Sequence, residues 1–441
     1  MIDSLTRLLD LMQAQGAIRF YAKRLSPNDN SKNQVYLGGG FGALNVLPHA
    51  PVTTDETMRA GSIRRRDKAD LQFFWIDEAG LSPAPNAQLI LYPKYPEVRM
   101  SGFLFKTQRA PSDLMRSRDA GRVLFLGVTA DGRIFGYSSG AENPVSRELE
   151  AAGPIEQTGV FLDLTPLRAG AGNSRDALIA VLRAIHLKEW IPSQKLGPDG
   201  QPHPYAARNG GGYTLEAELG ISPNGYSEPD YLGWEVKQFG VTDFTSYRAK
   251  SPVTLMTPEP TGGIYREEGV EAFMRKFGYP DKSGKEGRIN FGGVYRTGGA
   301  HHADTGLAMR ISGYDAETGK IIDLDGGIAM VDINDRVAAF WGLRGLMDHW
   351  NRKHAKAVYV PSLARIPPPE YRYGSRPKLC EGTDFLLLIR AMATGAVYLD
   401  PAVKMENADT AKPAIKRRNQ FRVAHAALGG LYQRSERHEL V

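Results

Sequence analysis

The chain has 441 residues, of which 42% are hydrophobic, so it is long enough for two or three domains with buried cores. Its formal net charge of +6 is compatible with a polyanionic partner. The single cysteine, Cys380, excludes an intramolecular disulfide and favours a reducing compartment. Because the sequence has no apolar run of membrane-spanning length and no signal-like stretch, we expect a cytoplasmic protein.

Short apolar runs separated by turns dominate the first 190 residues. An amphipathic helix is expected over 5–15. The strand-like runs that follow are 18–21, 34–37, 71–76, 88–92, 102–105, 123–128 and 133–137. Thr129-Ala130-Asp131-Gly132 predicts a hairpin turn between the last two. Many short strands at this spacing favour a barrel or a sandwich, and the apolar spacing predicts a helix over 174–187.

The segment 191–209 has a different composition. It is rich in proline and glycine and poor in apolar residues, which is typical of a linker between domains. The remaining residues, 210–441, are expected to form a mixed α/β unit. Within that unit, helices are predicted over 337–352 and 385–394.

Residues 210–240 hold the most informative group of charged residues. Asp230 precedes Glu235-Val236-Lys237, and a strand over 234–239 would point Glu235 and Lys237 to the same face. Two carboxylates suit Mg²⁺, and Lys237 could orient a water for in-line attack on phosphorus. The alternative is that this triplet is a solvated strand face, as most acid-x-Lys triplets are.

A glycine-rich stretch lies just upstream of these charges. Gly210-Gly211-Gly212 followed by Thr214 predicts a loop and then a helix that Thr214 caps. The free amides of such a helix start can bind phosphate. Glu216 would either supply a third carboxylate from this helix or be a plain acid on the helix face.

These residues together resemble the MvaI/BcnI restriction endonucleases, which are relatives of the MutH mismatch-repair nickase. The matching residues are Thr214-Leu215-Glu216, Pro229-Asp230 and Glu235-Val236-Lys237, followed downstream by 251–257, 395–400 and 420–423. The resemblance covers roughly residues 205–425. It implies an α/β PD-(D/E)xK nuclease fold like that of MutH, with Mg²⁺ as the cofactor. It also implies that Asp230 and Glu235 are metal ligands, that Lys237 positions the water, and that Glu216 is a supporting carboxylate.

The same resemblance places DNA contacts in the catalytic unit. The family pattern near the C-terminus has an acid-x-Arg pair, a basic loop and a segment that ends in Phe-Arg. The expected contacts are Thr214, Asp400, Arg417, Arg418, Asn419 and Arg422. Ala402 stands where the pattern has arginine, so another side chain would have to make that contact. His301-His302 could hint at a metal site, but without a further ligand at suitable spacing we favour loop histidines or DNA contacts.

The first unit carries a second resemblance. Residues 22–29 are similar to the K-x-LSxND signature of EcoRII-type effector domains, which are mainly-β pseudobarrels that read DNA with two arms. The first arm would lie at 23–36 and the second at 93–99, whereas the glycine-rich stretch 32–42 departs from the pattern. The implied DNA contacts are Lys23, Arg24, Asn28, Asp29, Lys94, Glu97 and Arg99, following the usual pairings with base edges. The alternative is that these polar residues only solvate loops.

An effector-like domain joined to a catalytic domain is the layout of a type IIE restriction endonuclease. The expected organisation is an effector domain over 1–190, a linker over 191–209 and a nuclease domain over 210–441. We expect the chain to be a monomer. Its expected partner is double-stranded DNA, bound at two copies of a CC/WGG-type site. A cognate DNA methyltransferase is the expected genetic partner. A MutH-like nickase and a non-catalytic DNA-binding protein remain as alternatives.

Overall fold

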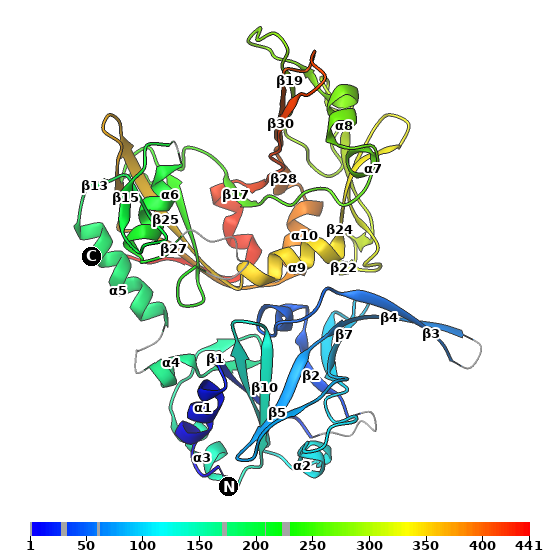
Figure 1. Ribbon diagram of the computed structural model, residues 1–441, viewed down its shortest axis with the longest axis vertical. Helices are drawn as coiled ribbons and strands as arrows, with labels where there is room; N and C mark the ends of the chain where they lie inside the picture. Colours follow the sequence, from blue (N-terminus) through cyan, green and yellow to red (C-terminus); the bar gives the residue numbers. More distant parts are fainter. Residues whose placement is uncertain (1, 28–32, 60–61, 170–173, 208, 223–229) are drawn as a thin grey trace. The chain divides into compact units, whose positions relative to one another are not determined.

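The computed structural model describes residues 2–27, 33–59, 62–169, 174–207, 209–222 and 230–441. The chain divides into two compact units, Met1–Ala180 and Val181–Val441 (Figure 1). The division falls inside helix α5 (Ser174–Leu187), which confirms the helix expected there. No helix in the described part of the chain is long and apolar enough to cross a membrane.

Unit 1 is built on a seven-stranded sheet. Its order is β11 (Gln157–Thr158), β12 (Phe161–Asp163), β1 (Ala17–Arg24), β9 (Val123–Thr129), β10 (Arg133–Ser139), β5 (Gln72–Asp77) and β6 (Gly80–Pro83). Neighbouring strands are antiparallel except β10 and β5. All of β9 is buried, as its continuous apolar run predicts, and the hairpin expected after it connects β9 to β10.

Helix α1 (Leu5–Ala14) covers the core of this sheet. Ser4 caps it by accepting a hydrogen bond from the Arg7 amide, and its apolar stripe packs against buried strand residues. The other helices of unit 1 are η1 (Gly42–Asn45), α2 (Ser112–Arg116), α3 (Pro144–Ala151) and α4 (Thr165–Ala169).

The second sheet of unit 1 has five strands. Its order is β2 (Val35–Gly39), β8 (Glu97–Ser101), β7 (Gln88–Tyr92), β4 (Ser62–Asp70) and β3 (Thr53–Arg59), and β3 and β4 form a long hairpin (Figure 1). The strand expected over 102–105 is wrong, because the strand is β8 and a turn follows it. Gly102 begins that turn with φ +76°, and a Cβ there would collide with the Asn86 carbonyl.

The main sheet of unit 2 carries the candidate site. Its order is β13 (Ile191–Pro192), β26 (Glu370–Tyr373), β25 (Lys356–Arg365), β27 (Lys378–Thr383) and β32 (Tyr432–Arg437). Strand β16 (Glu235–Gly240) runs parallel to β25, with Glu235 opposite Ala357 and Lys237 opposite Tyr359. Strand β25 pairs with β16, β26 and β27, and this interior position goes with its burial over most of its length.

Much of the segment expected to be a linker belongs to unit 2. Ile191 pairs with Tyr371 of β26, while β14 (Gln194–Leu196) and β15 (Pro202–Pro204) form a small hairpin. The prolines therefore lie at short strands and turns rather than in an extended connection.

Helix α6 (Gly210–Glu218) begins earlier than the sequence indicates. The glycines form its first turn, so Thr214 lies inside the helix and the expected Thr214 cap is wrong. A Cβ on Gly210 would collide with Ser193 Oγ, and one on Gly211 would lie 3.0 Å from Tyr371 Cε1. Glycine is needed here for close packing against the sheet, and Tyr373 donates a hydrogen bond of 2.7 Å to the Gly211 carbonyl.

The rest of unit 2 consists of small sheets and short helices. The sheets are β17 (Val253–Met256) with β31 (Phe421–Val423) and β28 (Val397–Leu399); β20 (Ala308–Ile311) with β23 (Gly327–Val331) and β24 (Val337–Gly342); β18 (Tyr279–Pro280) with β19 (Ile289–Gly292), β29 (Ala402–Glu406) and β30 (Ala414–Lys416); and β21 (Tyr314–Asp315) with β22 (Lys320–Ile321). The helices are α7 (Ile264–Glu267), α8 (Val270–Phe277), α9 (Leu343–Lys353), α10 (Phe385–Ala393) and η2 (His425–Leu431).

The helix expected over 385–394 is confirmed. The one expected over 337–352 is wrong in its first third, where β24 precedes α9.

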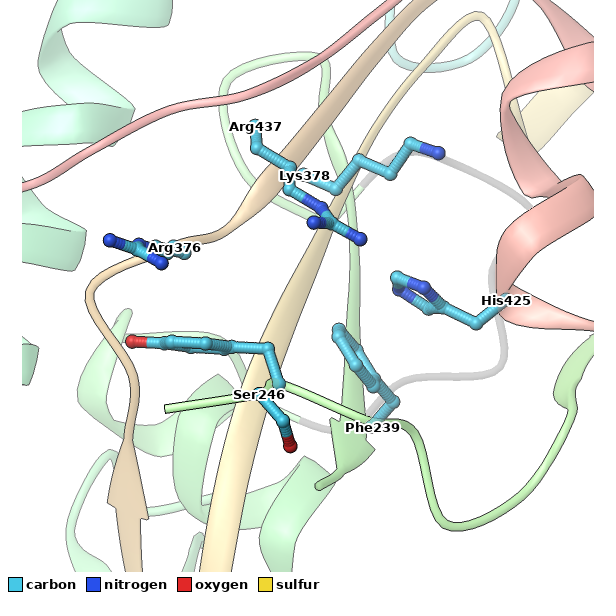
Figure 2. A pocket seen from close by; sticks show the side chains of 7 residues that line it. Phe239, Ser246, Arg376, Lys378, His425 and Arg437 are labelled. Atoms are coloured by element: carbon cyan, nitrogen blue, oxygen red, sulfur yellow. The ribbon is translucent and has the colours of Figure 1, made fainter. Parts of the chain in front are cut away.

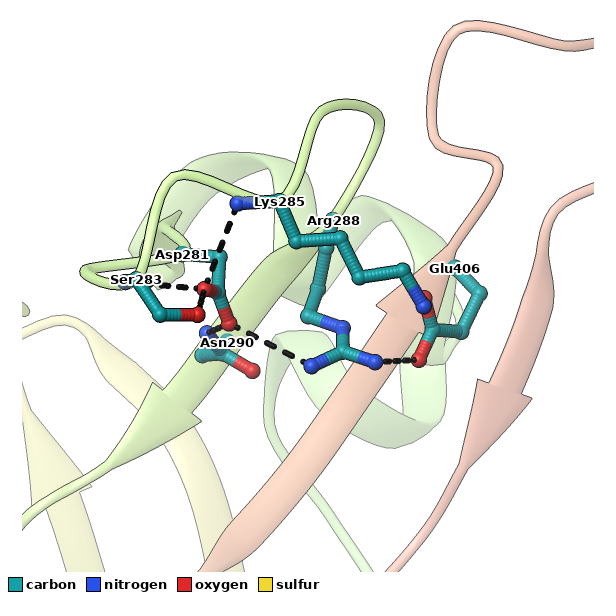
Figure 3. A network of polar contacts seen from close by, with 6 residues as sticks. All are labelled: Asp281, Ser283, Lys285, Arg288, Asn290 and Glu406. Atoms are coloured by element: carbon teal, nitrogen blue, oxygen red, sulfur yellow. Dashed lines mark hydrogen bonds and ion pairs between the residues drawn. The ribbon is translucent and has the colours of Figure 1, made fainter.

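Charged side chains fix the β18–β19 hairpin to β29 (Figure 3). Arg288 lies between two carboxylates, with Nη1 3.5 Å from Asp281 Oδ2 and Nη2 2.6 Å from Glu406 Oε1. Lys285 adds a second ion pair of 3.0 Å to Glu406. These cations hold the pKa of Glu406 near about 2, well below its ordinary value.

Candidate active site

Glu235 and Lys237 lie on one face of β16, as strand alternation predicts. Lys237 Nζ donates a hydrogen bond of 2.8 Å to Glu235 Oε1. The Glu235 side chain is only 4% exposed and that of Lys237 is 23% exposed. The pair is therefore a largely buried ion pair at the start of the strand and not a solvated surface pair.

Asp230 is held against the same strand from the preceding turn. The Val236 amide donates a hydrogen bond of 2.9 Å to Asp230 Oδ2. Burial, followed by the negative charge of Glu235, raises the pKa of Asp230 to about 6, although the Val236 amide and Lys237 oppose the shift. The structure thus brings together Asp230, Glu235 and Lys237, and it places two carboxylates close enough to repel one another.

One carboxylate oxygen at this site is left over. Glu235 Oε2 is buried and has no hydrogen-bond partner among the described residues. A buried acceptor without a partner is costly, and a divalent cation shared with Asp230 would satisfy it and offset the repulsion. Hence the donor set fits a hard cation such as Mg²⁺.

The site supplies few protein ligands. Within the ranges that the structure describes, no group of three or more His, Cys, Asp or Glu side chains is placed to hold a metal ion. Two carboxylates would leave the other positions to water and to phosphate oxygens, which is the usual arrangement for Mg²⁺. His301 and His302 belong to no such group among the described residues.

Helix α6 carries the other two residues expected near the site. Glu216 is half-buried on this helix. Burial is the main cause that raises the pKa of Tyr373, the charge of Glu218 comes next, and the charge of Glu216 makes a smaller contribution. Thr214 is fully buried, and its hydroxyl accepts a hydrogen bond of 3.0 Å from the Gln194 amide. The Thr214 side chain therefore ties α6 to β14 and offers no surface to DNA in this structure.

Asp400 and Arg422, expected as DNA contacts, bind each other. Arg422 Nη1 donates a hydrogen bond of 2.6 Å to Asp400 Oδ2, and its Nη2 donates one of 2.9 Å to the Pro252 carbonyl. The pair joins β31 to the ends of β28 and β17. Both side chains keep part of their surface, 27% for Asp400 and 19% for Arg422, so a contact with DNA would use an arginine that is already oriented.

The basic loop before β31 is divided between buried and exposed residues. Asn419 is 2% exposed and donates hydrogen bonds to Glu259 Oε1 and to the Tyr265 hydroxyl, so a direct DNA contact by its side chain is not supported. Arg417, by contrast, is 56% exposed, and Arg418 is exposed beside the Gln420 amide. These two arginines remain available to a polyanion.

The candidates of unit 1 are also divided. Lys23 and Arg99 line one cavity of about 340 Å³. Glu97 does not line it but forms an ion pair of 2.7 Å with Arg99. Arg24 instead pairs with Glu150 at 2.9 Å, and Lys94 is exposed in the turn before β8. Asn28 and Asp29 lie outside the described residues.

Further polar residues, which the sequence analysis did not name as DNA contacts, line the same cavity. Gln34, Tyr36 and Arg122 line it beside Lys23 and Arg99. Arg122 is 1% exposed and donates hydrogen bonds to several backbone carbonyls, including a 2.9 Å bond to Ser26, so it fixes the wall. Gln34 and Tyr36 lie in the segment expected to be the first arm, whereas no sequence signal distinguishes Arg122, which comes from a separate segment.

The family relationship of the chain follows from comparison with known proteins. A family model described as the MvaI/BcnI restriction endonuclease family matches residues 179–432, which is more than half of the chain. The chain is similar to the solved complex of restriction endonuclease MvaI with its cognate DNA substrate, with 17% identity and a TM-score of 0.44 over 60% of this chain and 98% of that one. For MvaI in the absence of DNA, the identity is 15% and the TM-score is 0.34, with the same coverage. No curated protein matches the chain. On the strength of the family match, the chain belongs to the MvaI/BcnI restriction endonuclease family and is a site-specific DNA endonuclease.

Proposed function

We propose that the chain is a type IIE restriction endonuclease that hydrolyses double-stranded DNA in a Mg²⁺-dependent reaction. Asp230 and Glu235 would hold the metal, Lys237 would position the attacking water, and Glu216 would be a supporting carboxylate. The observation that carries this proposal is the buried Glu235 Oε2, which has no partner among the described residues and lies at a site shared with Asp230.

The roles of the protein groups follow from their contacts. When bound, a divalent cation supplies charge neutralisation at the phosphate and favours deprotonation of water. The hydrogen bond from the Val236 amide holds Asp230 in place, so this ligand does not have to be reoriented when substrate binds. Lys237 uses one hydrogen on Glu235 and has others with which it would orient water.

The target that we propose is a five-base-pair CC/WGG site, cut between the second C and the central pair. The support is the resemblance of both units to families that read such sites, together with the exposed Arg417 and Arg418 and the preoriented Arg422. Sequencing the ends of a digested genome library tests it. A consensus unrelated to CCWGG would reject the target and leave the nuclease assignment standing.

We also propose that unit 1 is an effector domain of the EcoRII pseudobarrel type, which binds a second copy of the site. Its support is the cavity that joins Lys23 of β1 to Arg99 of β8, the two segments expected to be DNA-gripping arms. Two separate DNA surfaces would make the stimulation allosteric in the strict sense. The working form would be a cytoplasmic monomer accompanied by a cognate methyltransferase.

A further inference from the structure

A small basic pocket lies near the C-terminal end of β16 (Figure 2). It has a volume of about 30 Å³, and its walls include Phe239, Tyr247, Arg376, Lys378, His425 and Arg437. It adjoins a groove of about 420 Å³ that shares Tyr247, His425 and Arg437 and adds Arg248 and Lys250. The pocket is too small for a base or a sugar, whereas the groove beside it is more than ten times larger in volume.

Strand register places this pocket on the same face of the sheet as the candidate active site. Lys237 is opposite Tyr359, Tyr359 is opposite Lys378, and Lys378 is opposite Arg437. Paired residues share a face, and Phe239 shares that face because it follows Lys237 by two residues. Two strand spacings separate Lys237 from Lys378, or about 10 Å between their backbones.

The charge in this pocket is not neutralised by the protein. Lys378 and Arg437 form no ion pair with any residue that the structure describes, and none of the described wall residues has a carboxylate. Arg376, in contrast, has an acidic partner. Its Nε donates a hydrogen bond of 2.7 Å to Glu439, while its guanidinium lies over the Tyr247 ring. The pocket therefore presents at least two unpaired cations.

His425 lies close enough to Lys378 and Arg437 to be affected by their positive charges. Its ring lies 4.2 Å from that of Phe239, and its Nε2 is buried without a partner among the described residues. Burial, then the charges of Lys378 and Arg437, lower the pKa of His425 to about 4. The imidazole is neutral at pH 7 and can still donate or accept a hydrogen bond at the pocket wall.

Resting on the proposed nuclease function, we propose that this pocket binds one backbone phosphate of the bound duplex other than the phosphate that is hydrolysed. Lys378 and Arg437 supply charged donors to the phosphate oxygens. Hydrogen bonds between such cations and an anionic oxygen are stronger than hydrogen bonds between neutral groups. A second fixed phosphate on the face of Glu235 and Lys237 would set the register of the backbone in the active site. Lys378 and Arg437 are thus positioning residues.

The first test measures the salt dependence of binding by the full chain. The probe is a short duplex with one copy of the mapped cleavage site, studied with Ca²⁺ in place of Mg²⁺. Lys378→Gln and Arg437→Gln should each weaken binding about tenfold and reduce the slope of log Kd against log salt by about one. The double variant should also lose about one, because both cations act on one phosphate. Arg434→Gln is the control, since Arg434 lies on β32 on the opposite face and is 70% exposed.

The second test locates the phosphate. A methylphosphonate, which removes the charge of one phosphate, is placed at each backbone position in turn. One non-scissile position should weaken wild-type binding and have no further effect on Lys378→Gln or Arg437→Gln, as a double-mutant cycle requires. Either variant alone is sufficient if the other does not fold.

Each remaining outcome has a definite meaning. If the wild type cuts the duplex but no phosphate couples to either residue, the pocket assignment is wrong and the nuclease proposal stands. If the wild type neither binds nor cuts DNA, the nuclease proposal itself fails. If inorganic phosphate raises the melting temperature of the wild type but not of Lys378→Gln, while the salt slopes for DNA are equal, the pocket holds a free anion and our assignment is overturned.

Discussion

At the scale of single residues, the carboxylates of Asp230 and Glu235 in the candidate site repel each other. Asp230 and Glu235 are both removed from water and lie near one another, and only one cationic side chain, Lys237, is bonded to the pair among the described contacts. Such an arrangement disfavours the fully ionised state of the free protein. A divalent cation bound at the proposed metal site would remove the repulsion.

Removal of either charged partner should stop the chemistry. Lys237→Ala or Asp230→Ala should lower the cleavage rate at least about a thousandfold, because each removes a water-positioning group or a metal ligand. Specific DNA binding should be kept. Lys237→Ala should lower the melting temperature, because it leaves the buried Glu235 without its cation, whereas Asp230→Ala relieves the repulsion and should not. Glu381→Gln is a suitable control, since it neutralises a carboxylate on the opposite face of the same sheet. Near-normal cleavage by either active-site variant would reject the assignment.

The sequence predicts some site residues better than others. The common face of Glu235 and Lys237 follows from strand alternation alone and needs no tertiary information. The burial of Thr214 and Asn419 depends on Gln194 and Glu259, which are distant along the chain. A motif shows which side chains are present, but it does not show which of them are already used inside the protein.

At the scale of elements, helix α6 shows why a glycine run can be a packing feature. Gly210 faces Ser193 and Tyr371, whereas a Cβ on Gly212 would meet nothing within 4 Å. The sequence pattern indicated a phosphate loop because the same residue type serves both purposes. The space around each glycine, which the sequence does not contain, decides between them.

This difference gives a matched pair of substitutions. Gly210→Ala should destabilise the protein by about 1–3 kcal/mol through overpacking against Ser193 and Tyr371. Gly212→Ala should stabilise it by roughly 0.5–1 kcal/mol, since alanine is the better helix former and the space is open. Chemical denaturation of the two variants measures both signs. Equal effects would show that α6 does not pack as described.

The network around Arg288 should make unit 2 sensitive to acid. Glu406 has a pKa of about 2 in the folded protein and 4.5 as its ordinary value, so it stabilises the fold above pH 4.5. That contribution is lost as the pH falls from 4.5 towards 2. Glu406→Gln should therefore be less stable at neutral pH and lose less stability on acidification. The exposed Glu317→Gln is the control in denaturation curves recorded across this range. Parallel wild-type and Glu406→Gln curves would contradict the role of the network.

Element boundaries were hardest to predict where β-type and helical signals adjoin. Residues 337–342 are apolar and could belong to a helix or a strand, and pairing with β23 makes them β24. Gly342 is then the N-cap of α9, which begins at Leu343. Strong isolated patterns, such as α1, α5 and α10, were correctly predicted because one period extends over the whole element.

At the scale of the whole molecule, the two units differ in how directly the sequence indicates their function. The family match covers residues 179–432 and so lies almost entirely in unit 2. In unit 1 the DNA-reading role depends on a short signature and on the cavity around Lys23 and Arg99. The predicted stimulation of cleavage by a second copy of the DNA site is therefore the property of the whole chain that most needs a test.

Cleavage should depend on a second copy of the site bound by unit 1. A plasmid with one site should be cut slowly and be rescued by a short cognate duplex, because occupancy of unit 1 would shift the chain towards its active state. Arg99→Ala should lose the rescue while the basal rate is kept. Arg147→Ala, an exposed residue of the same unit paired with Glu142, should retain it. Equal rates on one-site and two-site plasmids would reduce unit 1 to an anchoring module.

The most direct measurement is a supercoiled plasmid digest with Mg²⁺ that compares the wild type with Glu235→Gln and scores linear against nicked product. The account predicts linear product from the wild type, none without Mg²⁺, and none from Glu235→Gln at matched DNA binding. Nicked product alone would indicate a nickase of the MutH type. Absence of Mg²⁺-dependent cleavage, or equal cleavage by Glu235→Gln, would contradict the assignment of Asp230, Glu235 and Lys237 as the centre that cuts DNA.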